Sequence, residues 1–318
     1  MTSVHPVRPT DLVALVAFDG RVYPNEAMTR DRLGSEASSH PLETALDQWL
    51  SFATGRHTWI SVKGATLRGL VSARRRGSKA AWEIDCLIDA AEDDEGVLLS
   101  LLDRLAADAG RAGAEKVFLR MPAGSGTMAT VARTGFVAWQ GERLMVREGK
   151  VEPHALSAPE RATLRRWGRA DAYATFRLYN RSVPESVRRV EAATFREWNA
   201  ARERVSPPRQ TRQWVVECGG QMAGWLRTGV DGELGRFDLM ADASAPELQD
   251  FLIDVACARL ARQERLLTLV PEAAVGLRER LEQRGFQERE SFVVLARRVA
   301  RPVRMPQLAT AQAQTMLA

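Results

Sequence analysis

Cysteine, histidine and long apolar runs are all scarce in this chain, and each scarcity excludes a class of protein. The three cysteines, Cys86, Cys218 and Cys257, are odd in number and far apart, which argues against a disulfide framework. Their neighbours are apolar, so we expect buried free thiols. The four histidines lack metal-ligand spacing, and we predict no metal site. No run approaches the roughly 20 apolar residues of a membrane helix, so none is expected.

The first ten residues lack the pattern of an export signal. Residues 1–10 contain no basic segment followed by an apolar run, so the sequence predicts no secretory signal. The hydrophobic content of 45% is that of a globular protein rather than a disordered one. These features, together with the unpaired cysteines, predict a cytoplasmic protein.

Lysine is also scarce, so arginine carries most of the positive charge. The formal net charge is +5 and the sequence pI is about 9.5. Most arginines alternate with acidic residues, as in residues 202–204 and 278–280, a pattern typical of a solvated helix face. Denser arginine clusters occur in residues 74–76, 161–169 and 297–304, but no aromatic residues are spaced along them as stacking platforms. We therefore do not expect a nucleic-acid partner, although the clusters keep that alternative open.

The length of the chain suits two domains better than one. Its 318 residues divide into two parts of about 150 residues each. The segment 148–160 contains one glycine and two prolines, which is typical of a linker. We predict one domain over residues 1–150 and a second over residues 151–300. Residues 301–318 have little to bury, so we expect a flexible tail.

A pair of strand patterns joined by a glycine-bearing turn occurs once in each half of the chain. The paired segments are 58–62 with 67–71 and 213–217 with 222–226. Trp59 and Trp214 are 155 positions apart, and so are Gly69 and Gly224. The equal spacing indicates that the second hairpin repeats the first.

The rest of each half follows the same order of elements. Each half continues with a third strand, an amphipathic helix, a short apolar strand that ends at proline, a short helix and a last strand pair. Gly135 and Gly285 follow the short helices, where a glycine with positive φ commonly ends a helix. So many matching elements indicate an internal duplication. The matched segments are 81–88 and 235–240, 98–109 and 248–256, 117–122 and 266–271, and 144–147 and 292–296.

This order of elements resembles the GNAT (GCN5-related N-acetyltransferase) superfamily. Residues 7–15 resemble the family's first strand and the start of its first helix. The Gly-Phe pairs at residues 135–136 and 285–286 resemble its signature of a helix, Gly-Phe and a strand. The resemblance implies an α/β (α+β) protein with two tandem GNAT-like domains, each with a mixed, mostly antiparallel sheet flanked by helices.

The resemblance covers nearly the whole chain, over residues 4–148 and 165–299. In the second copy, the equivalent start lies at residues 172–179, and a helix is expected over residues 184–198. The resemblance implies the family's activity, which is transfer of an acyl group from an acyl-CoA to an amine. The residues of the expected site indicate whether this chain keeps it.

In GNAT enzymes the pyrophosphate of acetyl-CoA lies on backbone N–H groups at the start of the long helix, within a glycine-rich motif. The resemblance would place acetyl-CoA, or another acyl-CoA, on the backbone of Leu87, Ile88, Gly96, Val97 and Leu98. The loop in this chain keeps one glycine, and three acidic residues stand directly before it. Each would repel a pyrophosphate by on the order of 1 kcal/mol at a few Å in water.

The second copy departs further from the family motif. Residues 242–248 contain no glycine, and Ser244 followed by Pro246 and Glu247 is typical of an N-cap and a first helical turn. Helix initiation explains this loop without a cofactor, and neither loop carries the motif.

The catalytic groups that the family uses are also incomplete. Val131 and Leu281 stand where the family has a tyrosine general acid, and we expect both in the core. As a general base for the attacking amine, the resemblance leaves Glu83 or Asp85 in the first copy. Asp238 is the equivalent candidate in the second copy. The alternative is that these carboxylates lie on the solvated polar face of a strand.

These departures favour a GNAT-fold protein with weakened or lost acetyl transfer. Such a protein would act as a binding or scaffolding module, with a protein partner or as a homo-oligomer. The alternative is an active acyl-CoA-dependent N-acyltransferase that uses the first domain, where Gly96 survives, and a small-molecule amine as acceptor.

Overall fold

The computed structural model describes nine stretches of the chain. These are residues 3–11, 14–15, 23–34, 55–64, 66–91, 94–151, 156, 158–203 and 211–300. The tail predicted over residues 301–318 lies outside them, as does part of the predicted linker.

The first copy begins with a short strand and a 3-10 turn, and continues with three long strands, a long helix and a βαβ unit. Its elements are β1 (Ser3–Pro6), η1 (Pro9–Asp11), β2 (His57–Lys63), β3 (Thr66–Arg75), β4 (Ala81–Asp89), α4 (Glu95–Arg111), β5 (Lys116–Pro122), α5 (Met128–Arg133) and β6 (Val137–Glu148).

The described residues of the second copy repeat that order and include three α-helices between β7 and β8. Its elements are β7 (Ala162–Arg166), η2 (Arg169–Asp171), α6 (Ala172–Ser182), α7 (Glu185–Glu191), α8 (Phe195–Ala201), β8 (Arg212–Cys218), β9 (Gln221–Asp231), β10 (Leu234–Ala241), α9 (Glu247–Arg259), β11 (Arg265–Pro271), α10 (Val275–Glu282) and β12 (Gln287–Arg298).

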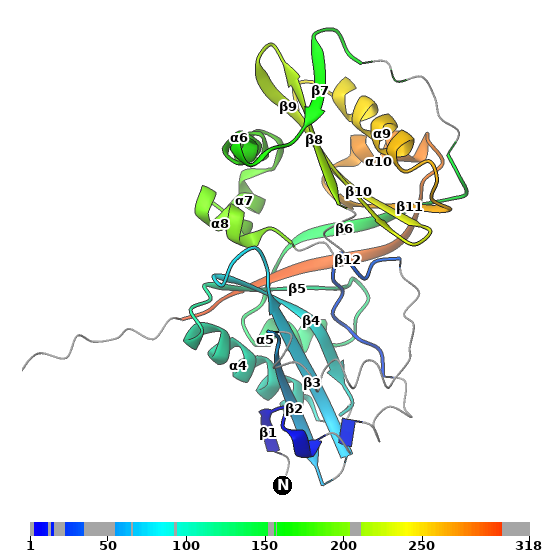
Figure 1. The fold of residues 1–318 in the computed structure, drawn as a ribbon. Helices are drawn as coiled ribbons and strands as arrows, with labels where there is room; N and C mark the ends of the chain where they lie inside the picture. Colours follow the sequence, from blue (N-terminus) through cyan, green and yellow to red (C-terminus); the bar gives the residue numbers. More distant parts are fainter. Residues whose placement is uncertain are drawn as a thin grey trace, which may run out of the picture.

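The twelve strands of the described residues form one sheet, in the order β1-β2-β3-β4-β5-β12-β6-β11-β10-β9-β8-β7 (Figure 1). The pairs β4 with β5 and β10 with β11 are parallel, and the other pairs are antiparallel. The predicted fold class, a mixed and mostly antiparallel α/β (α+β) architecture, is confirmed.

The start of the second copy differs from the prediction. The copy begins with β7, and residues 172–179 lie entirely within α6. The single helix expected over residues 184–198 is two short helices, because the chain is extended at Ala192. The side chain of Thr194 then accepts a hydrogen bond from Glu197 N–H at 3.2 Å and starts α8 as a new helix.

The two hairpins share the same irregularity, which supports the predicted repeat. The register shifts after Ser61 in the β2–β3 pair and after Val216 in the β8–β9 pair. Gly69 and Gly224 stand directly opposite these two residues. A β-bulge at one place in both copies is a detail that chance agreement between two unrelated hairpins would not produce.

Gly69 and Gly224 are required by the close approach of the long helices. A Cβ atom on Gly69 would lie 2.9 Å from Leu101 Cδ1 of α4, and one on Gly224 would lie 3.1 Å from Leu252 Cδ1 of α9. Each long helix thus packs directly on the backbone of the strand next to the bulge.

The two copies exchange their last strands. β12, which ends the second copy, lies between β5 and β6, and β6, which ends the first copy, lies between β12 and β11. In Figure 1 these two strands cross the middle of the molecule, with the first copy below them and the second above. The copies are consecutive in sequence, but each one is completed by a strand of the other.

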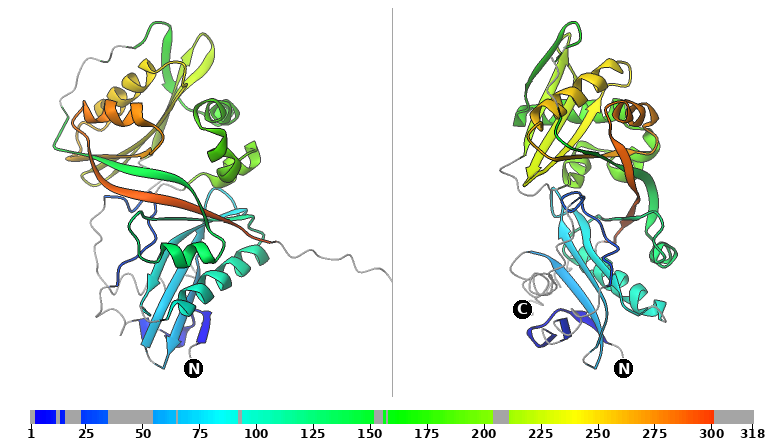
Figure 2. Two further views of the ribbon diagram at one scale, coloured as in Figure 1. Left: turned by 180° about the vertical axis from the view of Figure 1, so that it is seen from behind. Right: turned by 90° about the vertical axis from the view of Figure 1, so that its right-hand side faces the viewer.

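Each copy has its own apolar core beneath its long helix. α4 buries Leu98, Leu101, Leu102 and Leu105 against the first part of the sheet, and α9 buries a matching row against the second part (Figure 2). Gly135 and Gly285 have φ values of 83° and 81°, as predicted for the ends of the short helices.

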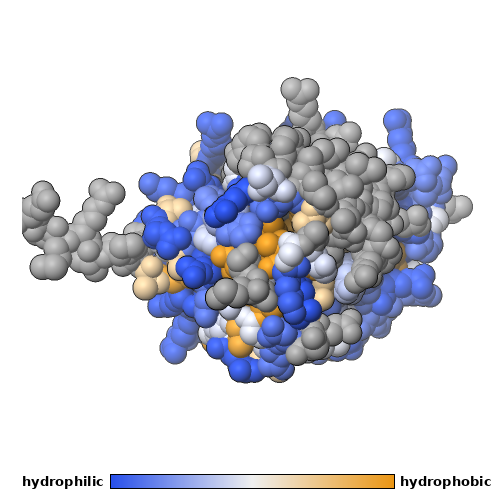
Figure 3. Space-filling model, turned by 90° about the horizontal axis from the view of Figure 1, so that it is seen from below, coloured by the Kyte–Doolittle hydropathy of each residue, from blue (hydrophilic) through white to orange (hydrophobic). Residues whose placement is uncertain are grey.

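Seen from the end that carries the first copy, the described surface is mostly hydrophilic, with a smaller apolar area near its centre (Figure 3). Among the described residues, no helix combines the length and the apolar character that crossing a membrane requires.

Candidate functional site

The parallel pairing of β4 with β5 is short, and a loop enters where the strands separate. The pairing ends at Glu83. Beyond it, Glu26 N–H donates to the Leu87 carbonyl at 2.8 Å, and Met28 N–H donates to the Arg120 carbonyl at 2.9 Å. The loop that contains Glu26 and Met28 therefore bridges β4 and β5 at their point of separation.

Asn25 ties this loop to the edge of β4. Its side-chain oxygen accepts hydrogen bonds from Leu87 N–H at 2.9 Å and from Ala27 N–H at 2.9 Å. Its amide nitrogen donates to the Asp85 carbonyl at 3.2 Å. The backbone N–H and C=O of Leu87, a predicted cofactor position, thus both have partners within the chain.

Gly96, another predicted cofactor position, also has its backbone N–H bonded to a side chain of the protein. Asp94 is the N-cap of α4, and its side chain accepts a hydrogen bond from Gly96 N–H at 3.1 Å. Glu95 follows in the first turn and forms an ion pair with Arg133 of α5. The negative charges of Asp94 and Glu95 therefore lie at the positive end of the helix dipole of α4.

The remaining predicted cofactor positions are core residues. Ile88, Val97 and Leu98 have side chains that are 7% exposed or less. Leu87 on β4 and Val97 and Leu98 on α4 belong to one apolar cluster of the first copy, and Ile88 belongs to a neighbouring one.

The equivalent loop of the second copy is an aspartate turn. The Asp242 carboxylate accepts hydrogen bonds from the N–H and the hydroxyl of Ser244, at 3.2 and 2.8 Å, and from Arg181 at 2.8 Å. Ser244 does not cap α9 as predicted; the N-cap is Pro246, which has no side chain able to accept. The predicted Ser244 cap is wrong, because the Ser244 hydroxyl donates to the Asp242 carboxylate within the turn instead of binding the start of α9.

The candidate general bases of the first copy, Glu83 and Asp85, are buried. Glu83 is 2% exposed and forms ion pairs with Arg76 at 3.2 Å and Arg74 at 3.3 Å. Burial raises the pKa of Glu83, although the two guanidinium groups oppose this. Asp85 is fully buried and pairs with Arg56 at 2.8 Å. The solvated strand face that was the alternative interpretation is therefore wrong.

The other sequence candidates are structural. Val131 and Leu281, in place of the family tyrosine, are both fully buried. All three cysteines are free, and burial raises the pKa of the Cys86 thiol to about 12 and that of Cys257 to about 11. Cys218 is partly exposed, unlike the prediction. No group of three or more His, Cys, Asp or Glu in the described part of the chain could hold a metal ion.

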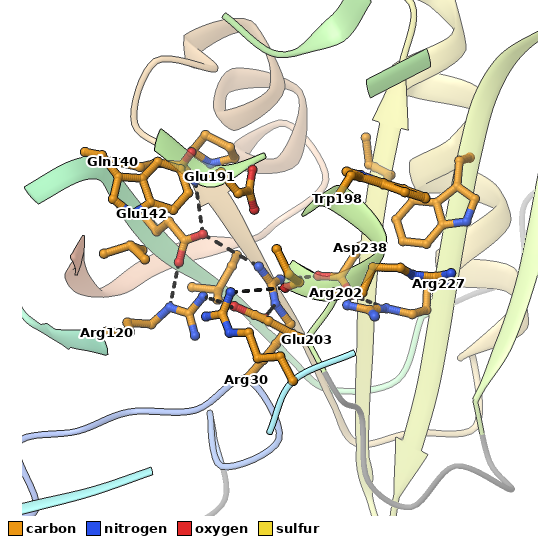
Figure 4. A pocket seen from close by; sticks show the side chains of 18 of the residues that line it. Arg30, Arg120, Gln140, Glu142, Glu191, Trp198, Arg202, Glu203, Arg227 and Asp238 are labelled. Carbon is orange, nitrogen blue, oxygen red and sulfur yellow. Dashed lines mark hydrogen bonds and ion pairs between the residues drawn. The ribbon is translucent and has the colours of Figure 1, made fainter. Parts of the chain in front are cut away.

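A cavity of about 230 Å³ lies where the two copies meet (Figure 4). The exchanged strands β6 and β12 contribute to it, together with β5 of the first copy, β9 to β11 of the second, and α6, α7 and α8. Three tryptophans and five arginines are among its lining residues: Trp139, Trp198, Trp225, Arg30, Arg76, Arg120, Arg202 and Arg227.

Glu203 is the centre of a buried charge network beside this cavity. Its carboxylate accepts from Arg120 at 2.7 Å and from Arg76 at 3.2 Å, and it also pairs with Arg30. Burial acts to raise the pKa of Glu203, but the charges of Arg120, Arg30 and Arg76 outweigh it and hold the pKa well below its ordinary value. Glu142 completes the network through Arg120, at 2.7 Å.

Asp238, the candidate base of the second copy, lines the cavity and is held by arginines. It accepts from Arg227 at 2.8 Å and pairs with Arg30, which reaches it from the first copy. Burial acts to raise the pKa of Asp238, but the charges of Arg227 and Arg30 overcome it and lower the pKa. Arg30 also pairs with Glu142 of the first copy at 3.6 Å, so it links carboxylates of both copies.

Similarity to solved structures identifies this architecture. A GCN5-related N-acetyltransferase from Sphaerobacter thermophilus is 15% identical over 96% of this chain and 98% of that chain, with a TM-score of 0.54. A Drosophila protein is 13% identical over 94% and 99% of the two chains, with a TM-score of 0.50.

The chain has the GNAT fold.

A tandem GNAT protein from the clavulanic acid biosynthesis pathway, solved without AcCoA, is 12% identical over 95% of this chain and 100% of that chain, with a TM-score of 0.49. No family model and no curated protein matches the sequence.

Sequence reasoning missed most of the cavity of this GNAT-fold chain. Arg202 and Glu203 were expected on a solvated helix face, but they follow the end of α8, and Glu203 is only 12% exposed. A signal for Arg120 was present, because it is the one charged residue between Val117 and Met121 in an apolar strand. A charge in such a position requires a buried partner, which the sequence could not identify.

Proposed function

We propose that this GNAT-fold protein has weakened or lost acetyl transfer and acts as a binding protein, with the central cavity as its ligand site. The observation that carries the proposal concerns two backbone donors. Leu87 N–H already donates to Asn25, and Gly96 N–H already donates to Asp94. An acyl-CoA would have to displace both side chains before it could use these groups.

The displacement would be unfavourable. Asn25 makes three hydrogen bonds, each contributing about 1 kcal/mol net. Asp94 and Glu95 add repulsion of about 1 kcal/mol for each charge pair a few Å apart in water. Because 1.4 kcal/mol is a factor of about ten in affinity, these terms together would weaken binding by more than about a hundredfold.

Neither candidate general base of the first copy, Glu83 or Asp85, is an available proton acceptor. A general base has to reach the attacking amine directly or through one water. Glu83 and Asp85 are buried, and arginines hold both carboxylates. The residues present do not fit acyl-CoA or the transfer step in this copy, and we derive no catalytic step from them.

Calorimetric titration of acetyl-CoA into the full chain tests the proposal. We expect no heat of binding up to millimolar ligand. A double variant, Asp94→Ser with Glu95→Gln, keeps a capping hydroxyl and removes both charges, so it should bind acetyl-CoA more tightly than the natural chain.

Micromolar binding to the natural chain, lost in Gly96→Glu, would instead support the alternative, an acyl-CoA-dependent N-acyltransferase that acts on a small-molecule amine. Scaffolding through a protein partner or a homo-oligomer stays a prediction, which sedimentation velocity of the purified chain would examine.

A further inference from the structure

Arg202 is the cavity arginine whose charge the described residues do not balance. No carboxylate in the described part of the chain pairs with it. Its guanidinium carbon lies 5.3 Å from the ring centroid of Trp198 and 5.5 Å from that of Trp167. Burial and the nearby charge of Arg227 both lower the pKa of Arg202. Because Arg202 lies near two aromatic rings and another arginine and has no carboxylate partner among the described residues, an anion would bind it favourably.

Two further polar groups of the lining lack a partner, and both are donors. Arg120 is 1% exposed, and its Nη1 has no acceptor among the described residues. The indole Nε1 of Trp139 is likewise buried without one. Neither atom is open to solvent, so a ligand in the cavity would reach them only if neighbouring side chains moved, and Arg202 remains the group that an anion would contact.

The charge of the lining has the same sign as these donors. Five arginines line the cavity, against the four acidic residues Glu142, Glu191, Glu203 and Asp238. Arginines neutralise three of the acids, and Glu191 accepts a hydrogen bond from Tyr179 at 2.8 Å. Burial raises the pKa of Glu191. An ammonium ligand would therefore find no carboxylate without a partner and would be repelled by Arg202.

We infer that the cavity binds a small monoanionic carboxylate with a flat apolar ring, whose carboxylate pairs with Arg202 and whose ring packs against the tryptophans of the lining. Trp198 and Trp225 lie on the second copy and Trp139 on β6, so rings face the cavity from several elements. The inference rests on the proposed binding function and names its ligand class.

The size of the cavity limits the ligand. Pockets for drug-sized molecules are about 300–1,000 Å³, and an apolar cavity of about 150 Å³ accepts benzene. A volume of about 230 Å³ therefore suits one or two rings with a short acid side chain.

A carboxylate fits this site better than a phosphate. The planar guanidinium of Arg202 matches a carboxylate in a bidentate geometry. A phosphate dianion would bring a second negative charge close to Glu203, Glu142 and Asp238, which share the same cavity.

The test is calorimetric titration of the full chain with phenylacetate and with indole-3-acetate. Matched probes are phenylacetamide, which keeps the ring and removes the charge, benzylamine, which reverses the charge, and inorganic phosphate, which removes the ring. We expect at least one carboxylate to bind, the amide to bind at least about tenfold more weakly, and the amine not to bind.

Arg202→Gln should weaken carboxylate binding by at least about tenfold and leave binding of the amide nearly unchanged. The matched control is Arg189→Gln on α7, an exposed arginine paired only with Glu185 among the described residues, and it should change nothing. The comparison of acid with amide on the natural chain keeps the inference testable if Arg202→Gln fails to fold.

Three results would overturn the inference: no heat from either carboxylate at millimolar concentration, equal affinity for acid and amide, or tighter binding of inorganic phosphate than of both carboxylates. The acetyl-CoA titration is independent of them. If acetyl-CoA and a carboxylate both bind, the proposed loss of transfer fails and the ligand class stands; if neither binds, only the ligand class fails.

Discussion

Asn25 and Leu87 are 62 positions apart, yet the Asn25 side-chain oxygen accepts the Leu87 backbone N–H at 2.9 Å. Together with the backbone hydrogen bonds of Glu26 and Met28, this contact holds a loop of the first copy against β4 and β5. It connects the departure of this chain from the GNAT motif with a feature of its folded backbone, and its energy can be measured.

Replacing Asn25 by alanine should destabilise the protein by about 1–3 kcal/mol, because the buried Leu87 N–H would lose its acceptor. Urea unfolding followed by circular dichroism measures the change. Asn199→Ala is the matched control, since Asn199 is exposed on α8 and should change stability by less than about 0.5 kcal/mol. Equal stability of both variants would show that the Asn25 contact contributes little.

Alanine at Gly69 or at Gly224 should destabilise the chain, because the long helix of each copy lies against the glycine. The new Cβ at Gly69 would also lie 3.2 Å from the Ile88 carbonyl oxygen, a backbone atom that cannot easily shift. We therefore expect about 1–3 kcal/mol at each site, with the larger loss at Gly69. Thermal unfolding compares the two with Gly124→Ala, where a Cβ would meet nothing within 4 Å.

Asp94→Ala should cost about 1 kcal/mol through loss of the cap on α4, and Asp94→Ser should restore most of it. The readout is the midpoint of urea unfolding. If the serine variant is as unstable as the alanine variant, then the hydrogen bond to Gly96 N–H is not the stabilising contact.

Glu203→Gln should destabilise the protein by about 3–5 kcal/mol at neutral pH, because the buried Arg76 and Arg120 and the partly buried Arg30 would lose a shared negative charge. Burial acts to raise the pKa of Glu203, but the arginines lower it in the folded state. The stabilisation is therefore complete above the unfolded pKa of about 4.3 and is lost as the pH falls through the folded pKa.

The difference between Glu203→Gln and the natural chain should accordingly shrink as the pH is lowered from 6 toward 3. Unfolding by urea at several pH values measures it. Glu264→Gln, at an exposed glutamate paired with Lys150, should give no such trend. A difference that is constant with pH would mean that the carboxylate charge of Glu203 is not what stabilises the fold.

Much of the architecture could be predicted from local pattern. The alternation around Trp59 and Trp214, the helical spacing of Leu98 to Leu105, and the glycines after the short helices all specify structure within a few residues. The burial of the candidate bases was harder to predict. Alternation on β4 shows which residues share a face of the strand, but not which face other parts of the protein bury. Glu83 pairs with Arg76, seven positions earlier, and Arg76 in turn contacts Ala201 and Glu203 of the second copy, a distant segment that the pattern on β4 does not reveal.

By itself, the sequence determined the duplication, the order of elements in each copy and the acidic start of α4, since each depends on neighbours along the chain. Only the tertiary structure decided that β6 and β12 exchange places, because two similar copies offer each last strand two nearly equivalent partners. The cavity follows from that exchange. Its arginines and carboxylates come from distant segments, and a charge on an isolated segment does not show which opposite charge will meet it after folding.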